Sequence, residues 1–213
     1  MMRNILCYGD SNTFGTDPVH GGRHPREARW TGVLQELLGD GYRVIEEGLG
    51  GRTTVFDDAL SEGRNGAQTL YPCIASHNPL DLIVIMLGTN DLKHRFQVTA
   101  WDLGKAMERL IDQVQTFPFR PAYPVPEILI VSPIYIKEGI AYSPYGCFGA
   151  EAAAMSHCFA REYEQVSREK RCHFFDGATG AEASEEDRLH MTAKEHMRLA
   201  VALEREVRKI LAA

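Results

Sequence analysis

A serine, a histidine and an aspartate occur in this sequence at positions from which they could act together on an ester carbonyl. Ser11 follows an apolar run within the segment Gly9-Asp10-Ser11, and Asp187 and His190 lie three residues apart near the other end of the chain. A serine hydroxyl needs a neighbouring base to become a nucleophile, and a carboxylate beside that base fixes its tautomer and stabilises its charged form. These residue types therefore predict Ser11 as nucleophile, His190 as general base and Asp187 as the group that orients it.

Two segments between these ends offer hydrogen-bond donors for a developing oxyanion. They are Gly50-Gly51 and Gly88-Thr89-Asn90-Asp91. Glycine lets a backbone N–H approach a substrate closely, and an asparagine amide is a side-chain donor. With the backbone N–H of Ser11, Gly51 and Asn90 are the candidate oxyanion hole. Each segment taken alone is equally typical of a turn, and Ser11 alone is typical of a helix cap.

The elements that must position these residues are predicted from short apolar runs. The runs cover residues 3–8, 42–47, 82–87, 128–131 and 172–175. The third and fourth are continuous rather than alternating, which is typical of strands covered on both faces of a parallel sheet. Ser11, Gly51 and Asn90 each follow one of the first three runs. Since ligands bind beyond the carboxyl ends of parallel strands, we expect these three residues to meet at one edge.

Helical patterns fill the gaps between the runs, so the chain is predicted to be an α/β protein with right-handed crossovers. Apolar stripes predict helices over residues 30–38 and 103–114, and a further helix is expected over 151–171. Thr192 and Glu195 have the spacing of a capping box at the start of the last helix. Residues 17–26 and 132–149 are predicted to be long loops at the mouth of the site.

Composition limits the class of protein. A chain of 213 residues predicts a single domain over residues 1–213, and a net charge of −6 argues against nucleic-acid or anionic-membrane partners. No signal peptide or membrane span is visible. Five scattered cysteines indicate reduced thiols and a cytoplasmic location. No Cys or His cluster has metal-site spacing, so neither a metal nor another cofactor is expected.

The segments together resemble the SGNH (GDSL-like) hydrolases over nearly the whole chain. The four blocks of that family are matched in order by Gly9-Asp10-Ser11, Gly51, Gly88-Thr89-Asn90-Asp91 and the segment from Asp187 to His190. The chain is most similar to the arylesterase/acyltransferase subgroup. The closer likeness lies in residues 29–34, 45–49 and 85–91.

The resemblance implies a three-layer αβα sandwich with a parallel, flavodoxin-like five-stranded sheet. It implies a carboxylic ester hydrolase that acts on aryl or alkyl esters through an acyl-enzyme on Ser11, with acyl transfer as a side activity. Short-chain esters are expected because a single domain without a lid helix or a long apolar surface stretch leaves little room for a long acyl chain. It assigns Ser11, Asp187 and His190 to catalysis and Ser11, Gly51 and Asn90 to the oxyanion hole. Relatives in this subgroup often form homo-oligomers, so a second copy of the chain is a partner to test beside a small-molecule ester.

Departures from the subgroup bear on specificity. Asn12 replaces a leucine common in relatives, and Thr16 replaces a large aromatic, which predicts a more polar, open entrance that favours hydrolysis over transfer. Asn12, Thr89 and Leu189 are the candidate substrate-binding residues. Further candidates for lining the pocket are Phe14, Phe56, Ile134, Tyr135, Tyr145 and Phe148. We expect five of the other histidines to be surface or packing residues, namely His77, His94, His157, His173 and His196.

Other functions remain open from the sequence. A polar pocket around Asn12 would favour a carbohydrate O-acetylesterase of the same fold. A flavodoxin-like nucleotide-binding module would hold phosphate at residues 9–13, but that segment lacks the P-loop lysine and the dinucleotide fingerprint. A cysteine nucleophile is disfavoured because Cys7 lies inside an apolar strand.

Overall fold

A five-stranded sheet in which every strand pair is parallel forms the centre of the structure, in the order β2-β1-β3-β4-β5. We describe residues 2–212 of a computed structural model. The strands are β1 (Arg3–Gly9), β2 (Tyr42–Gly48), β3 (Leu82–Met86), β4 (Glu127–Ser132) and β5 (His173–Asp176). Each predicted apolar run lies within one residue of a strand at both ends, and the α/β class is confirmed.

Alternate residues of the central strands contribute to two separate cores. Leu6 and Tyr8 of β1 lie in one hydrophobic cluster, whereas Ile5 and Cys7 lie in the other. Successive side chains of a strand point to opposite faces, so a strand that is apolar at every position must be covered on both sides. The continuous apolar run of β3, buried along its whole length, follows the same rule.

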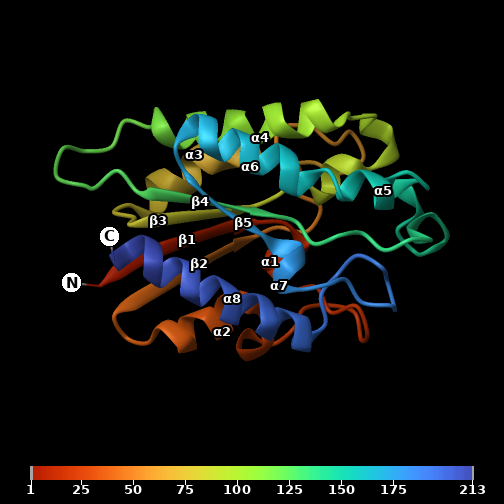
Figure 1. Cartoon of the computed structure of the whole chain (residues 1–213), viewed down its shortest axis with the longest axis horizontal. Coiled ribbons are helices and arrows are strands. Elements are labelled where there is room, and N and C mark those ends of the chain that lie inside the picture. The colour runs from red at the N-terminus through yellow and green to blue at the C-terminus, as the bar shows by residue number, and fades with distance from the viewer. Residues whose placement is uncertain (1, 213) are drawn as a thin grey trace.

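Helices cover both faces of the sheet and complete three layers (Figure 1). The helices are α1 (Ser11–Phe14), α2 (Trp30–Leu38), α3 (Gly66–His77), α4 (Ala100–Gln115), α5 (Ala152–Ser156), α6 (Phe159–Lys170), α7 (Gly177–Gly180) and α8 (Ala193–Ala212). Buried residues of α3, α4, α5 and α6 belong to one cluster, and those of α2 and α8 to the other. The sheet is therefore packed between two helical layers.

One helical prediction needs correction, and one helix has no counterpart among the predictions. The helix expected over 151–171 is broken into α5 and α6. The hydroxyl of Ser156 donates to the carbonyl oxygen of Ala153 at 2.6 Å and accepts from the backbone N–H of Ile136 at 3.1 Å. A serine that bonds a preceding carbonyl competes with the regular helical pattern, which accounts for the break. Helix α3 was not predicted, because Pro72 lies inside it and its apolar spacing is weak.

The start of α8 shows half of the expected capping box. The backbone N–H of Glu195 donates to Thr192 Oγ1 at 3.4 Å, but the Glu195 carboxylate accepts from the backbone N–H of Glu182 at 3.1 Å instead of turning back to Thr192. That second bond ties the loop after α7 to α8. This loop leads to Asp187 and His190.

Candidate active site

Ser11 is the first residue of α1, directly beyond the carboxyl end of β1. The side chain of Asp10 caps this helix by accepting the backbone N–H of Asn12 at 2.9 Å, so Asp10, and not Ser11, is the cap. Burial raises the pKa of the Asp10 carboxyl. A Cβ at Gly9 would lie 2.1 Å from Thr13 Oγ1, so only glycine allows α1 to turn this tightly.

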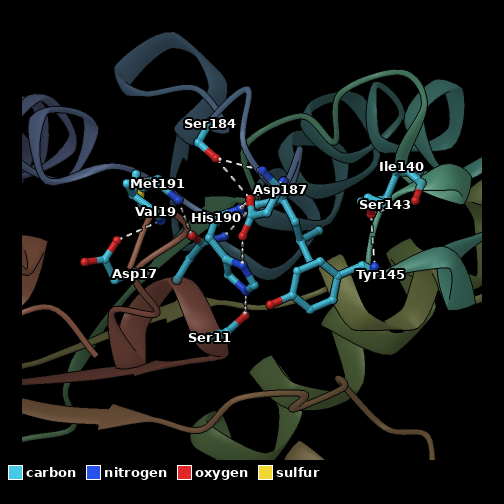
Figure 2. A network of polar contacts seen from close by, with 12 residues as sticks. Ser11, Asp17, Val19, Ile140, Ser143, Tyr145, Ser184, Asp187, His190 and Met191 are labelled. Atoms are coloured by element: carbon cyan, nitrogen blue, oxygen red, sulfur yellow. Dashed lines mark hydrogen bonds and ion pairs between the residues drawn. The ribbon is translucent and has the colours of Figure 1, made fainter. Parts of the chain in front are cut away.

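His190 contacts both Ser11 and Asp187 (Figure 2). Its Nε2 lies 2.8 Å from Ser11 Oγ, and its Nδ1 lies 2.6 Å from Asp187 Oδ2. All three residues are buried or nearly so. These contacts require Nδ1 to carry a proton toward the carboxylate and leave the Nε2 lone pair directed at the hydroxyl. The three residues predicted to act together are thus brought together from opposite ends of the chain.

The Asp187 carboxylate is held by the loop that carries His190. Its Oδ1 accepts the backbone N–H groups of Leu189 at 3.0 Å and His190 at 2.9 Å, and the hydroxyl of Ser184 at 3.1 Å. Partial burial acts to raise its pKa, but the hydrogen bonds from His190 and this loop outweigh that effect and lower the pKa of Asp187 below its usual range. The carboxylate therefore remains charged beside the imidazole.

Asn12 ties the same loop to α1. Its Nδ2 donates to the carbonyl oxygen of Leu189 at 3.3 Å, and its Oδ1 accepts the backbone N–H of Met191 at 3.0 Å. The two bonds lie on either side of His190. Asn12 is buried and is absent from the pocket that contains Ser11, so it does not form the polar entrance expected from the sequence.

The two oxyanion candidates lie in the same pocket as Ser11. Gly51 has φ +79°, a conformation that favours glycine, and Asn90 belongs to the 3-10 helix η2 (Thr89–Leu92) beyond β3. Among residues 2–212, neither the N–H of Ser11 nor that of Gly51 has a backbone or side-chain acceptor. The Asn90 amide donates one hydrogen to the carbonyl oxygen of Arg52 at 3.1 Å, and its geometry leaves the second hydrogen for a ligand.

Arg52 fixes the loop that carries Gly51. Its guanidinium donates to the carbonyl oxygens of Gly9, at 2.8 Å, and Glu47, and lies 4.1 Å from the ring centroid of Tyr8. These contacts join the ends of β1 and β2, where the nucleophile and one donor candidate are placed. The buried Asp91 next to Asn90 accepts the backbone N–H and hydroxyl of Thr54, and burial raises the pKa of Asp91 to about 7.

The pocket around Ser11 has a volume of about 360 Å³. It is lined by Ser11, Thr16, Gly50, Gly51, Asn90, Lys93, Arg95, Tyr145, Cys147, Phe148, Leu189 and His190. Of the candidate substrate-binding residues, Leu189 lies here, but Asn12 and Thr89 are buried elsewhere. Tyr145 meets the His190 ring edge-on at 5.2 Å between centroids. The other predicted aromatic and aliphatic lining residues, apart from Phe148, do not line it.

Three lining residues were not identified from the sequence: Lys93, Arg95 and Cys147. Lys93 and Arg95 come just after the Gly88-to-Asp91 segment, so their position beyond β3 was the available signal. Cys147 lies in the loop of residues 132–149, which was expected at the mouth of the site. The loop of residues 17–26, expected there as well, contributes none of the lining residues.

The remaining histidines differ partly from expectation. His77, His94 and His173 each pair with a glutamate at 2.5–3.1 Å, so they do have carboxylate partners. His157 packs on Tyr135 with 4.0 Å between ring centroids, and His196 is fully buried. Within residues 2–212, His190 is distinguished because it bonds a serine hydroxyl as well as a carboxylate.

A scan against protein families matches residues 7–198 to the GDSL-like lipase/acylhydrolase family. The chain belongs to this family. The predicted resemblance is thereby confirmed, and with it a carboxylic ester hydrolase of the SGNH fold. A search of curated proteins found no match. No helix within residues 2–212 is long and apolar enough to cross a membrane.

Solved structures support the same family. A carbohydrate acetylesterase family member from Sinorhizobium meliloti is 40% identical, with a TM-score of 0.91 and all of both chains covered. The aryl esterase of M. smegmatis is 37% identical, with a TM-score of 0.91 and 98% and 99% of the two chains covered. A putative arylesterase from Agrobacterium tumefaciens is 39% identical, with a TM-score of 0.88 over 98% of this chain and 100% of the other.

Proposed function

We propose that this GDSL-family hydrolase cleaves short-chain esters through an acyl-enzyme on Ser11. The observation that carries the proposal is the single imidazole of His190 placed 2.8 Å from Ser11 Oγ and 2.6 Å from Asp187 Oδ2. In the first step His190 Nε2 takes the hydroxyl proton as Ser11 Oγ attacks the carbonyl carbon. Asp187 stabilises the imidazolium that forms.

The negative charge that develops on the carbonyl oxygen is assigned to three donors. They are the N–H groups of Ser11 and Gly51 and the second amide hydrogen of Asn90. The ester C–O bond then breaks, and His190 returns its proton to the departing alcohol. In the second step His190 deprotonates a water that attacks the acyl-enzyme. The carboxylic acid leaves, and Ser11 regains its proton.

Labelling tests the assignment of the nucleophile. An aryl phosphonate should modify Ser11 in the folded protein, and Ser11→Ala should lose both labelling and esterase activity. Ser167→Ala is a matched control, because Ser167 is a buried serine that donates to Glu164 within α6. Modification of another residue, or activity retained in Ser11→Ala, would exclude this mechanism.

Short acyl groups and hydrolysis are the expected preferences. The pocket volume of about 360 Å³ is at the lower end for small-molecule sites. A series of p-nitrophenyl esters should give the highest kcat/KM from acetyl to butyryl. An aryl acetate supplied with a small alcohol in dilute solution should give mainly acetate. A preference for long chains, or a dominant transfer product, would contradict this substrate assignment.

Deacetylation of a carbohydrate is the second candidate. It is supported by the similarity to a solved carbohydrate acetylesterase family member and by the polar side chains of Thr16, Lys93 and Arg95 in the pocket. Acetylated sugars and aryl acetates compared at equal concentration would separate the two candidates. We also propose that the protein works in a reducing compartment, which its five free cysteines support.

A further inference from the structure

The pocket around Ser11 differs in charge from the protein as a whole. The chain carries a net charge of −6, yet Lys93 and Arg95 line the pocket and, among residues 2–212, no carboxylate does. A third cation, Arg64, lies beside Gly51 of the same wall. The pocket that contains Ser11 therefore has a positively charged wall.

Lys93 and Arg64 both approach Gly51, the proposed oxyanion donor. A Cβ built on Gly51 would lie 3.8 Å from Lys93 Nζ and 3.5 Å from Arg64 Nε. Because Gly51 has no side chain, both cationic groups have access to the space beside its N–H. The side chain of Lys93 is only 9% exposed, so its charge is poorly screened by water.

Asp58, which is not among the lining residues, bonds two of the cations. It accepts Lys93 Nζ at 3.2 Å and Arg95 at 3.0 and 2.7 Å, and its side chain is fully buried. The hydrogen bonds from Arg95 are the main reason that the pKa of Asp58 falls to about 2, so it remains ionised. Since Asp58 does not line the pocket, it orients the cations without presenting a negative charge to a ligand.

Among Lys93, Arg95, Arg64 and Asp58, the positive charges exceed the negative charges by two. Lys93, Arg95 and Arg64 contribute three, and Asp58 compensates one. Within residues 2–212 Arg64 has no carboxylate within 4 Å, and its Nε donates to Ser61 Oγ at 3.0 Å. Asp91, which interacts electrostatically with Lys93, is fully buried and bonded to Thr54, and burial raises its pKa to about 7, so near neutral pH it adds only part of a negative charge.

We propose that Lys93, Arg95 and Arg64 form a subsite for an anionic group, such as a carboxylate, on the ester substrate. The inference rests on the proposed function, since it concerns the substrate of the same site. The Lys93 ammonium has three hydrogens and one protein acceptor, and the guanidinium of Arg95 has N–H groups beyond the two bonded to Asp58. These remaining donors match the charge-assisted hydrogen bonds that a carboxylate accepts.

Paired esters test the subsite. The first pair is 3-acetoxybenzoate and its neutral methyl ester, which share an acetyl group and a phenol core. The second pair is an O-acetylated methyl glucuronide and the corresponding glucoside. The native enzyme should favour the anion in at least one pair, by roughly tenfold in kcat/KM at low salt, and the ratio should fall as NaCl is raised. If the anion is preferred in only one pair, that pair shows whether the carboxylate of the substrate is carried by an aromatic ring or by a sugar.

Variants locate the effect. Arg64→Gln removes a charge without leaving an unpaired carboxylate, and Lys93→Gln removes a charge on a residue that lines the pocket while Asp58 keeps its bonds to Arg95. Both should lower the anion-to-neutral ratio by several-fold. Lys209→Gln, on the exposed end of α8, is the matched control and should leave the ratio unchanged. Equal rates for both members of both pairs in the native enzyme would refute the subsite. So would an equal loss for anionic and neutral esters in both variants.

A binding measurement separates this inference from the proposed function. Calorimetry on the native protein with 3-hydroxybenzoate and with its methyl ester needs no catalysis. Tighter binding of the anion, weakened in Arg64→Gln, would support the subsite even if Ser11→Ala kept its esterase activity and the mechanism failed. Equal binding of the two compounds, with Ser11→Ala inactive, would refute the subsite alone.

Discussion

Replacing Asn12 with leucine should reduce catalysis by loosening the loop that carries His190. The change leaves the Leu189 carbonyl and the Met191 N–H, both in a buried region, without their partner. A buried backbone group without a partner costs about 1–3 kcal/mol. The bond to Leu189 is long at 3.3 Å, so it should contribute the smaller share. We expect a loss of about 2–4 kcal/mol in the free energy of unfolding.

The catalytic effect follows from geometry. His190 lies between the two bonded residues, and a displacement of about 1 Å can lower a rate by about 10²-fold. Asn12→Leu should therefore lower kcat by roughly 10- to 100-fold. KM should stay within about twofold, because Asn12 does not line the pocket.

Urea unfolding and steady-state kinetics on p-nitrophenyl acetate measure both effects. Asn4→Ala is the matched control, since Asn4 bonds the carbonyl of Pro79 at 3.0 Å in an exposed region on β1, at the opposite end of the strand from the site. It should leave kcat unchanged. A folded Asn12→Leu protein with native kcat would show that the loop is held without Asn12. A change confined to KM would instead restore the substrate-binding role expected from the sequence.

Three further outcomes are expected. Asn90→Ala should lower kcat by about 10²–10³-fold with little change in KM, measured by steady-state kinetics, whereas a change in KM alone would make Asn90 a binding residue. A bulky maleimide should inactivate the native enzyme by modifying Cys147, because this residue is exposed and lines the pocket. Mass spectrometry should find the buried Cys7 unmodified, and the Cys147→Ser variant should resist inactivation. Burial lowers the pKa of His196 to about 3. Between pH 3 and 6.5 the unfolded chain therefore binds a proton at His196 more readily than the folded chain does. The free energy of unfolding should fall as pH falls through that range. His196→Asn should reduce this slope by up to about 1.4 kcal/mol per pH unit in chemical unfolding at several pH values, and an unchanged slope would contradict the assignment.

The positions of Ser11, Gly51 and Asn90 could be predicted because each follows an apolar strand. The carboxyl ends of parallel strands meet at one edge, so backbone topology alone brings the three together. The helix break at Ser156 could not be predicted in this way. It depends on a hydrogen bond to Ile136 in another segment, and such tertiary contacts leave no periodic signal in the sequence.

The pocket lining was harder to predict because it depends on side-chain direction. Lys93 and Arg95 are drawn to one wall by Asp58, which lies far from them in the sequence. Polar character at the entrance was expected from Asn12 and Thr16. Thr16 does line the pocket, but the charge comes from the residues after β3.

Asn12 shows most clearly why a neighbour of the nucleophile need not contact the substrate. Successive residues of a helix point about 100° apart, so Ser11 at the start of α1 can face the pocket only if Asn12 faces elsewhere. The side chain of Asn12 instead bonds the backbone of Leu189 and Met191, on either side of His190. One short helix thus presents the proposed nucleophile and fixes the loop that carries the proposed base. The distance of 2.8 Å between Ser11 Oγ and His190 Nε2 therefore depends on α1, which is capped by Asp10, as well as on the bonds that Asp187 makes within the loop of His190.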